Sequence, residues 1–320
     1  MKEQEIRPKN LFEKYLELSE KDTKSFDKTQ LISTNCVVCN SKNTNPFIKK
    51  NDFNYDLCNN CGSLFCNPRP SSIQLSSFYL NSNSANYWFE VFLPNVEETR
   101  REKIFKKKAL QLMTFINSKN ISISSLCDVG AGSGIFLEEL KKINESVSYY
   151  AIEPGEVSSN ILKDKGFNVL QESVENSTKW TNKFDFVTSL EVFEHVNDPL
   201  VFVKSINRLL KDDGYCLVTT LQYEGFDILN LGEKSNSISP PHHLNFASIE
   251  GLEILFKKAG FSEVFISTPG VLDVDIFINA DSGSEFSRVI KKRGKKFINE
   301  LQDLLIKHKM SSHVWILAKK

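Results

Sequence analysis

Between about residue 97 and residue 268, short apolar runs alternate with longer amphipathic stretches. Short apolar runs bounded by turn residues are typical of buried strands, whereas amphipathic stretches are typical of helices that cover a sheet. The expected strands lie at residues 125–127, 149–154, 184–190, 215–220 and 262–268. The repeated order of strand and helix predicts an α/β fold with a doubly wound, mostly parallel sheet and helices on both faces.

The N-terminal part of the chain divides into three segments before the large domain begins. We expect a polar helix at residues 11–18, within an N-terminal arm that spans residues 1–30. Residues 31–70 form a small lobe, and residues 71–100 form a cover segment rich in aromatic side chains. A helix from Glu97 to about Ile116 then leads into the first strand. The pattern therefore predicts one small lobe beside one large α/β domain.

The large domain, residues 101–320, ends in a strand at residues 313–318 that follows a long interruption. An insertion at residues 269–312 separates this strand from the preceding one and carries a basic helix at about residues 288–307. Long connections of this kind usually carry function. The basic run at residues 291–296 is compatible with contact to a phosphate or a membrane surface, and equally with a solvated helix face.

The composition argues against two classes of partner. The 320-residue chain has 40 basic and 40 acidic residues, so it carries no overall electrostatic footprint for nucleic acid. No stretch approaches a membrane span, and the start of the chain, Met1 to Lys24, is charged without an apolar core. We therefore expect a cytoplasmic protein. Its 24 phenylalanines are enough to fill a large core and to line a pocket.

A glycine-rich turn connects the first expected strand to the helix that follows it. Its candidate ligand-binding residues are Asp128, Gly130, Ala131, Gly132 and Gly134. Glycines at alternate positions let the backbone approach a ligand closely, and the next helix begins with free N–H groups. The third glycine comes one residue too early for the spacing of a nicotinamide-binding loop. The acidic residue ahead of the first glycine suits a ligand with an ammonium group or ribose hydroxyls better than a pyrophosphate.

Four segments in order resemble the motifs of class I S-adenosylmethionine-dependent methyltransferases. The glycine turn resembles the first motif, and Glu153 and Pro154 end the second strand, where a carboxylate can accept both ribose hydroxyls. Leu190 and Glu191 open the third segment, which continues through an acidic–His pair to an Asp-Pro helix start, and residues 209–220 match the fourth. The resemblance implies that S-adenosylmethionine binds at these residues, in a Rossmann-like sheet whose last strand is antiparallel beside the sixth.

Two Cys-x-x-Cys pairs lie in the small lobe. Cys36 and Cys39 form the first pair, Cys58 and Cys61 form the second, and residues 40–57 separate them. This spacing is within the range of a four-thiolate zinc site and predicts a zinc-ribbon-like lobe. Disulfides, a redox pair and reduced thiols are the alternatives, of which disulfides are uncommon in reducing compartments. With no open ligand position and no nearby histidine, the predicted zinc ion is structural.

Two adjacent histidines, His242 and His243, lie in a proline-rich segment at residues 239–248. The segment follows the fifth strand and precedes a helix that begins near Ser248, so we expect it to hang over the mouth of the ligand pocket. An imidazole held there near neutrality can remove a proton from an acceptor. The alternative is that both histidines are loop or helix-capping residues.

The order of zinc lobe, aromatic segment, methyltransferase core and histidine loop resembles sugar C-methyltransferases that carry an N-terminal zinc-binding domain. Those enzymes act on nucleotide-linked 4-keto-6-deoxy sugars, where a base removes the proton beside the ketone. His243 matches the last histidine of their His-Glu-His loop, and His242 stands where their glutamate stands. The resemblance implies a sugar or sugar-nucleotide acceptor in a glycan or secondary-metabolite pathway. We expect Tyr79, Tyr87 and Trp88 to close the acceptor pocket.

A third catalytic candidate, His195, follows Glu194 in the Asp-Pro segment. In small-molecule O-methyltransferases that resemble this chain, such a pair lies beside the cofactor, where acidic residues help to hold a metal. His195 therefore assists deprotonation of the acceptor, or it fixes its loop through a side-chain hydrogen bond. Two further functions stay open: a metal-assisted O-methyltransferase of a lipid or phenol, and a non-catalytic zinc-ribbon binding module or nucleic-acid modifier.

Overall fold

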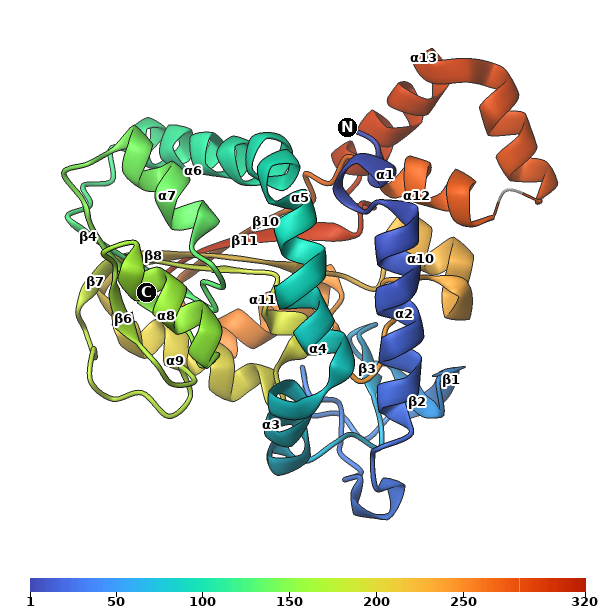
Figure 1. Ribbon diagram of the computed structural model, residues 1–320, viewed down its shortest axis with the longest axis horizontal. Helices are drawn as coiled ribbons and strands as arrows, with labels where there is room; N and C mark the ends of the chain where they lie inside the picture. The colour runs from blue at the N-terminus through green and yellow to red at the C-terminus, as the bar shows by residue number, and fades with distance from the viewer. Residues whose placement is uncertain (282) are drawn as a thin grey trace.

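The computed structural model describes residues 1–281 and 283–320, and a seven-stranded sheet forms its centre (Figure 1). Its strands are β4 Ser125–Val129, β5 Ser148–Ile152, β6 Asn168–Leu170, β7 Phe184–Leu190, β8 Leu210–Leu221, β10 Glu263–Ser267 and β11 His313–Lys319. Their order across the sheet is β10-β11-β8-β7-β4-β5-β6. Strand β11 runs antiparallel to both of its neighbours, β8 and β10, whereas the other pairs of neighbouring strands described in this sheet are parallel. This confirms the doubly wound, mostly parallel sheet with an antiparallel last strand.

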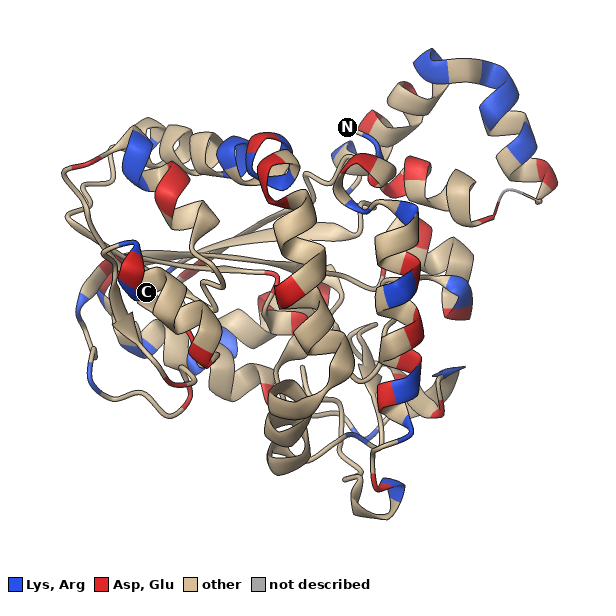
Figure 2. Ribbon diagram, viewed as in Figure 1, with Lys and Arg blue, Asp and Glu red and all other residues tan. Residues whose placement is uncertain are grey.

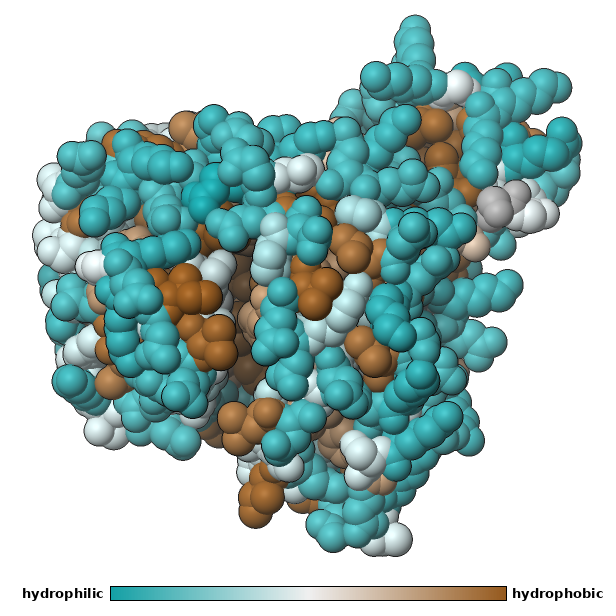
Figure 3. Space-filling model, viewed as in Figure 1, coloured by the Kyte–Doolittle hydropathy of each residue, from teal (hydrophilic) through white to brown (hydrophobic). Residues whose placement is uncertain are grey.

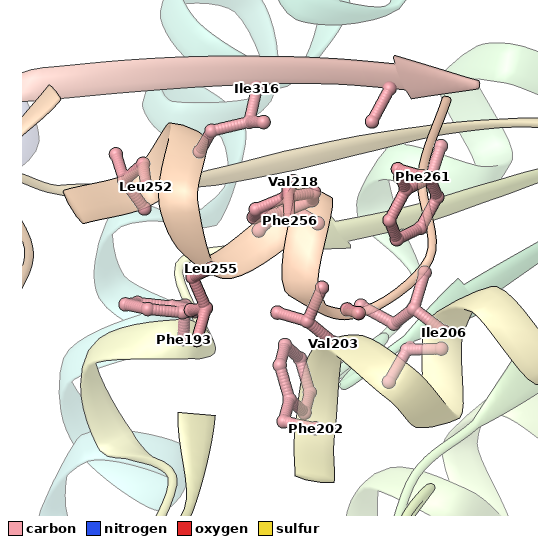
Figure 4. Packing of buried hydrophobic residues seen from close by; sticks show 14 of the residues in the cluster. Phe193, Phe202, Val203, Ile206, Val218, Leu252, Leu255, Phe256, Phe261 and Ile316 are labelled. Carbon is pink, nitrogen blue, oxygen red and sulfur yellow. The ribbon is translucent and has the colours of Figure 1, made fainter. Parts of the chain in front are cut away.

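Helices cover both faces of this sheet. They are α6 Lys106–Ser118, α7 Ile135–Ile143, α8 Glu156–Asp164, α9 Pro199–Leu209 and α11 Ile249–Lys258. Alternate strand residues point to opposite faces, so Leu126 and Leu217 pack with α6, α7 and α8, whereas Cys127 and Val218 pack with α9 and α11. Figure 4 shows the second of these layers, in which Val218 lies against Phe256 of α11.

Capping side chains explain where the helices near the glycine-turn edge of the sheet begin. The Asp198 carboxylate accepts the backbone N–H groups of Leu200 and Val201, both at 3.0 Å, and Pro199 takes the first helical position of α9. Proline suits that position because its missing N–H would have no partner there. Ser248 caps α11 in the same way, which confirms the predicted helix start.

On either side of the cysteine lobe, residues 1–30 and 71–105 are mostly helical. They contain α1 Glu3–Ile6, α2 Lys9–Thr23, a 3-10 turn η1 Lys28–Gln30, α3 Ser72–Asn81, α4 Asn83–Tyr87, a π-helical turn η2 Trp88–Phe92, α5 Leu93–Arg100 and a second π-helical turn η3 Arg101–Phe105. The helix expected at residues 11–18 is part of the longer α2. The cover segment, residues 71–100, is a chain of helices, and η3 continues it directly into α6.

A second, four-stranded sheet joins the cysteine lobe to the large domain. Its strands are β1 Thr44–Lys50, β2 Phe53–Cys58, β3 Leu64–Cys66 and β9 Asn245–Phe246, in that order. The first three strands come from the predicted lobe, whereas β9 comes from the loop that carries His242 and His243. Tyr55, Leu64 and Phe246 share one buried cluster. The lobe is therefore built onto the histidine loop.

The insertion before β11 forms a helical arch that projects from the rest of the chain (Figure 1). It consists of α12 Asp273–Ala280 and α13 Glu285–Lys307, beside α10 Phe226–Leu231 and the 3-10 turn η5 Gly232–Lys234. Phe226, Val274 and Ile290 belong to the buried cluster that attaches the arch. In the part of the chain that the structure describes, no helix is both long and apolar enough to cross a bilayer.

Candidate active site and metal site

The glycine turn lies at the carboxyl end of β4, and all three glycines have positive φ. The values are +71° for Gly130, +54° for Gly132 and +81° for Gly134, a region that residues with a side chain rarely adopt. A Cβ on Gly130 would lie 2.4 Å from Val192 Cγ2, whereas a Cβ on Gly132 would meet no atom within 4 Å. The first glycine is thus required by packing. At Gly132 the backbone faces open space, so a ligand could approach it closely.

Two buried carboxyl groups lie beside this turn. Thr188 Oγ1 donates a hydrogen bond of 2.7 Å to Asp128, and burial raises the pKa of this carboxyl to about 7. Glu153 accepts the N–H of Gly132 on one oxygen and that of Gly155 on the other, both at 2.9 Å. Burial also raises the pKa of Glu153. Because each oxygen of a carboxylate accepts two hydrogen bonds, Glu153 retains the capacity to bind ribose hydroxyls.

Leu190 ends β7, and Glu191 follows it with a φ of +56°. The Glu191 carboxylate accepts hydrogen bonds from Lys108 Nζ at 2.8 Å and Thr219 Oγ1 at 2.7 Å, and its second oxygen lies 3.3 Å from His313 Nδ1. Although burial opposes ionisation, the nearby Lys108 ammonium and His313 hold the pKa of Glu191 well below its ordinary value. The segment therefore places a fixed negative charge at the carboxyl edge of the sheet.

Three further titratable side chains, from Glu194, His195 and His243, meet near this edge. Their possible ligand atoms all lie within 4.8 Å of one another, and the two imidazole rings are 4.7 Å apart. His243 Nδ1 lies 2.6 Å from the Ser237 carbonyl oxygen, which can only accept, so Nδ1 carries the proton and Nε2 is left with a free lone pair. Thr220 Oγ1 donates to Glu194 at 2.7 Å. We call these three residues the carboxylate–histidine cluster.

Burial sets the charge state of this cluster. It lowers the pKa of His243 to about 4 and that of His195 well below the ordinary value, so both rings are neutral at physiological pH. Burial and the charge of Glu191 raise the pKa of Glu194 to about 8. The Tyr79 hydroxyl lies 3.3 Å from the His242 carbonyl oxygen, to which it donates, and 3.0 Å from His195 Nδ1. His243, which is neutral and carries its proton on Nδ1, therefore leaves Nε2 unprotonated.

The structure separates the two adjacent histidines of the loop. His242 is only 4% exposed, its Nε2 lies 2.9 Å from Ser84 Oγ, and its ring lies 4.8 Å from that of Phe78. Burial lowers its pKa to about 3. His242 thus packs into the helical cover, while His195 and His243 form the cluster.

The three aromatic residues expected over the pocket occupy different surroundings. Tyr79 hydrogen-bonds His195, as described above. Trp88 instead stacks on Phe92, with ring centroids 4.3 Å apart, and its ring centroid lies 5.0 Å from that of Tyr15 in α2. Tyr87 is half-buried at the end of α4. Figure 3 shows a recess with hydrophobic walls between the α8 side of the sheet and the α4–α5 segment.

The four cysteines of the small lobe converge on one point. The Sγ atoms of Cys36 and Cys61 are 3.7 Å apart, those of Cys39 and Cys58 are 3.6 Å apart, and all four lie within 4.8 Å of one another. A tetrahedral zinc ion with Zn–S bonds of about 2.3 Å places its sulfurs about 3.8 Å apart. The distances fit such a site and are far too long for disulfide bonds.

Hydrogen bonds link this cysteine group to the histidine loop. Ser248 Oγ donates to the carbonyl of Cys61, and the Tyr55 hydroxyl donates to the carbonyl of His243 at 2.6 Å. Pairing of β3 with β9 continues the connection, with Leu64 opposite Phe246. The cysteine lobe thus holds the backbone of the loop from which His243 projects.

Comparison with known proteins agrees with this geometry. The family described as "Methyltransferase domain" matches residues 96–264, more than half of the 320-residue chain. The chain belongs to this methyltransferase family. The matched segment is an S-adenosylmethionine-dependent methyltransferase domain, and it contains the glycine turn, both carboxyl groups beside it and the carboxylate–histidine cluster.

Two curated relatives with the same name show how much of the chain is similar in sequence. The ubiquinone biosynthesis O-methyltransferase of Actinobacillus pleuropneumoniae serotype 5b is 33% identical over 103 residues, which cover 29% of this chain and 44% of that protein. The protein of the same name from Escherichia coli O127:H6 is also 33% identical over 103 residues, covering 31% and 43%. The chain thus spans less than half the length of these curated relatives.

Among solved structures, the plantazolicin methyltransferase BamL, in complex with a desmethylPZN analog and SAH, matches with a TM-score of 0.52 and 15% identity. The match covers 78% of this chain and 94% of that one. The plantazolicin methyltransferase BpumL, with SAH, matches with a TM-score of 0.51 and 13% identity over 77% and 93% of the two chains. At such low identity these similarities show the fold alone.

Several residues of the methyltransferase site carry no local sequence signal. Ser237, which fixes the tautomer of His243, comes from a segment without a motif. Thr188 lies in an expected strand, but the strand pattern does not indicate that its hydroxyl holds Asp128. His313, the first residue of the expected last strand, reaches Glu191 because β11 pairs with β8. Only the register of the antiparallel last strand determines that contact.

Proposed function

We propose that the protein transfers a methyl group from S-adenosylmethionine to a small-molecule acceptor from which His243 removes a proton. The observation that carries the proposal is the hydrogen bond between His243 Nδ1 and the Ser237 carbonyl, at 2.6 Å. It leaves Nε2 as the proton acceptor on a ring that burial keeps neutral, with a pKa of about 4. His195, whose ring lies 4.7 Å from that of His243, is the second candidate base.

The residues around the glycine turn fit the cofactor. Glu153 has lone pairs for ribose hydroxyls, and the backbone at Gly132 faces open space. Asp128, buried and held by Thr188, offers a carboxyl group to a cationic or hydrogen-donating part of the ligand. When bound, S-adenosylmethionine supplies an electrophilic methyl group on a positively charged sulfonium. Ala131, Pro154, Leu190 and Glu191 complete the proposed cofactor contacts.

The proton has a defined destination. It leaves an O–H or C–H group of the acceptor for His243 Nε2, so His243 becomes an imidazolium and the acceptor atom becomes the nucleophile. The Ser237 carbonyl accepts the Nδ1–H of this imidazolium, and the ionised Glu191 carboxylate stabilises its charge. A positioned general base contributes about 10²–10⁴-fold to a rate, most when its pKa lies near the working pH, so the pKa of about 4 places His243 at the lower end of this range.

A sugar or sugar nucleotide is the first acceptor class that we propose. The support is the histidine loop with His243 in its last position, seated on a cysteine lobe and covered by a helical segment that brings Tyr79 to His195. We further propose that Cys36, Cys39, Cys58 and Cys61 hold a structural zinc ion. Such an ion would stabilise the lobe and, through it, the path of the histidine loop.

A second candidate function has its own observation. Glu194, His195 and His243 could hold a divalent metal, because their ligand atoms lie within 4.8 Å of one another. The named relatives are ubiquinone biosynthesis O-methyltransferases, so a phenolic hydroxyl is the corresponding acceptor. A bound metal would lower the pKa of that hydroxyl, and the histidines would then act as ligands.

One assay tests both candidates. Labelled S-adenosylmethionine is offered with a panel of nucleotide-linked 4-keto sugars and with catechols, in deuterated water, and the mass of each product is read. Labelled sugar with deuterium beside the ketone supports proton removal from carbon, whereas labelled sugar without deuterium indicates a hydroxyl acceptor. The metal-assisted alternative is supported if the catechol is labelled and if this activity is lost when a chelator removes the divalent metal. The cysteine lobe must keep its proposed zinc ion under the same conditions.

Two histidine variants complete the design. The change His243→Asn keeps a donor for the Ser237 carbonyl but removes the base, so we expect turnover to fall at least about a hundredfold with cofactor affinity retained. The matched control is His308→Asn, at an exposed position on the arch. Full activity of the His243 variant would refute the proposed mechanism.

A further inference from the structure

The long helix α13 bends at Gly294, and a cluster of cations surrounds the bend. Gly294 has a φ of +81° and a ψ of −178°, which interrupts the helical backbone for one residue. The flanking cations are Lys291, Lys292, Arg293, Lys295 and Lys296, which we call the basic bend. All five are exposed, and the Lys296 side chain is 90% exposed. Figure 2 shows them as the blue segment at the end of the arch.

These charges are poorly compensated within the chain. Lys296 lies 3.9 Å from Glu300, but the other four cations form no ion pair with any residue that the structure describes. The chain as a whole has equal numbers of basic and acidic residues. The basic bend is thus a local excess of positive charge on the part of the molecule that projects farthest from the sheet (Figure 1).

Large apolar side chains accompany the cations on the same helix. Phe286 is 52% exposed, Phe297 is 40% exposed and Val289 is 37% exposed. The other side of α13 is anchored, because Ile290 and Leu305 are buried in the cluster that attaches the arch. A helix face that contacts only water has no need of exposed phenylalanines. Exposed cations and exposed apolar side chains on the same helix are instead typical of a surface that binds a partner with both anionic and apolar groups.

We propose that the basic bend docks the protein onto an anionic lipid surface. The cations would meet headgroup phosphates, and Phe286 and Phe297 would enter the layer between headgroups and acyl chains. A nucleic acid offers the same phosphates and bases on which phenylalanine can stack, but no apolar layer for the aliphatic side chain of Val289, which is also exposed. The arch leads directly into His313, which lies 3.3 Å from Glu191, so docking would hold the methyltransferase site near the surface. The inference does not depend on the identity of the acceptor.

Sedimentation of the full chain with lipid vesicles tests the proposal. Vesicles of phosphatidylcholine alone are compared with vesicles that also contain phosphatidylglycerol. The protein should sediment only with the anionic vesicles, and less at high salt. The triple variant K291Q/K292Q/K295Q should reduce the partition coefficient at least about tenfold, since each cation contributes separately to the attraction. The variant F286S/F297S should lose the binding that persists at high salt.

The matched control removes the same charge elsewhere, as K107Q/K179Q/K204Q, three exposed lysines outside the arch. Equal loss in the control and the bend variant would show a general charge effect and overturn the proposal. Failure of the unmodified protein to sediment with anionic vesicles would overturn it as well. Tighter binding to RNA than to vesicles, or a bend-dependent dimer, would assign the surface to a different partner. Unchanged circular dichroism and cofactor binding show that each variant is folded.

Discussion

As the pH falls from 7 to 5, His242 should contribute a loss of stability, whereas Asp128 and Glu194, whose pKa values burial raises, contribute in the opposite direction. In the folded chain, burial lowers the pKa of this ring from 6.5 to about 3, so it stays neutral throughout this range. In the unfolded chain it takes up a proton near its ordinary pKa. The unfolded state therefore binds more protons between about pH 6.5 and pH 3, and the stability present above this window is lost as the pH falls through it.

The magnitude follows from the difference in proton uptake. At pH 5 an unfolded histidine is almost fully protonated and the folded ring is not, which lowers the free energy of unfolding by about 2 kcal/mol relative to pH 7. Solvent does not reduce the pKa shift of His242 noticeably, because this side chain is only 4% exposed. His243, with a pKa of about 4, adds a similar loss in the same direction.

Urea unfolding at pH 7 and at pH 5 measures this effect. The variant His242→Gln has an amide that can still hydrogen-bond Ser84. Its free energy of unfolding at pH 5 relative to pH 7 should be about 2 kcal/mol more favourable to the folded state than that of the unmodified protein, whichever sign the total change has. Acid release of the proposed zinc ion affects both proteins equally and cancels in the comparison. His308→Gln, at an exposed position, should leave the pH dependence unchanged. The reasoning is refuted if the His242 variant keeps the full pH dependence.

The remaining predictions concern the cofactor contacts, the zinc site and the glycine turn. Replacing Glu153 with Gln should weaken S-adenosylmethionine binding about tenfold or more by calorimetry, because charged hydrogen bonds are lost; unchanged affinity would remove it from the proposed contacts. Cys61→Ser should abolish stoichiometric zinc by metal analysis and also reduce methyl transfer, since the lobe holds the histidine loop; full zinc content would contradict the site. Gly130→Ala should lower the free energy of unfolding by about 2 kcal/mol or more, because its Cβ would lie 2.4 Å from Val192. Gly132→Ala, with a Cβ in open space, should cost less stability, and equal losses would show that packing is not the cause.

Local pattern was sufficient for six of the seven strands of the large sheet and for the residues near its carboxyl edge, but it missed the short edge strand β6, Asn168–Leu170, whose three residues are too few to give a clear period. Each strand, glycine turn and following helix is a continuous segment, so period and turn chemistry identify it without knowledge of the rest of the chain. The positions of Asp128 and Glu153 follow from that, because parallel strands end at one edge. The grouping of the four cysteines could be predicted equally well, because two Cys-x-x-Cys pairs at this spacing are themselves a sign of one four-thiolate metal site.

The division of roles between His242 and His243 was beyond the reach of the sequence. Neighbouring residues in a loop share the same local signal, and what separates them is the surface that each side chain meets after folding. His242 meets Phe78 and Ser84 from helices far away in the chain, whereas His243 meets Ser237 and His195. The resulting burial decides their pKa values.

The sequence by itself thus determined the methyltransferase sheet except for its edge strand β6, the glycine turn and the pairing of the cysteines, because these depend on contacts within short segments. Tertiary structure alone decided three other features. It added β9 to the sheet of the cysteine lobe, brought His313 to Glu191 through the register of β11, and assembled the carboxylate–histidine cluster. Each depends on where separate segments meet, and that is fixed by the burial of side chains distributed over the whole chain.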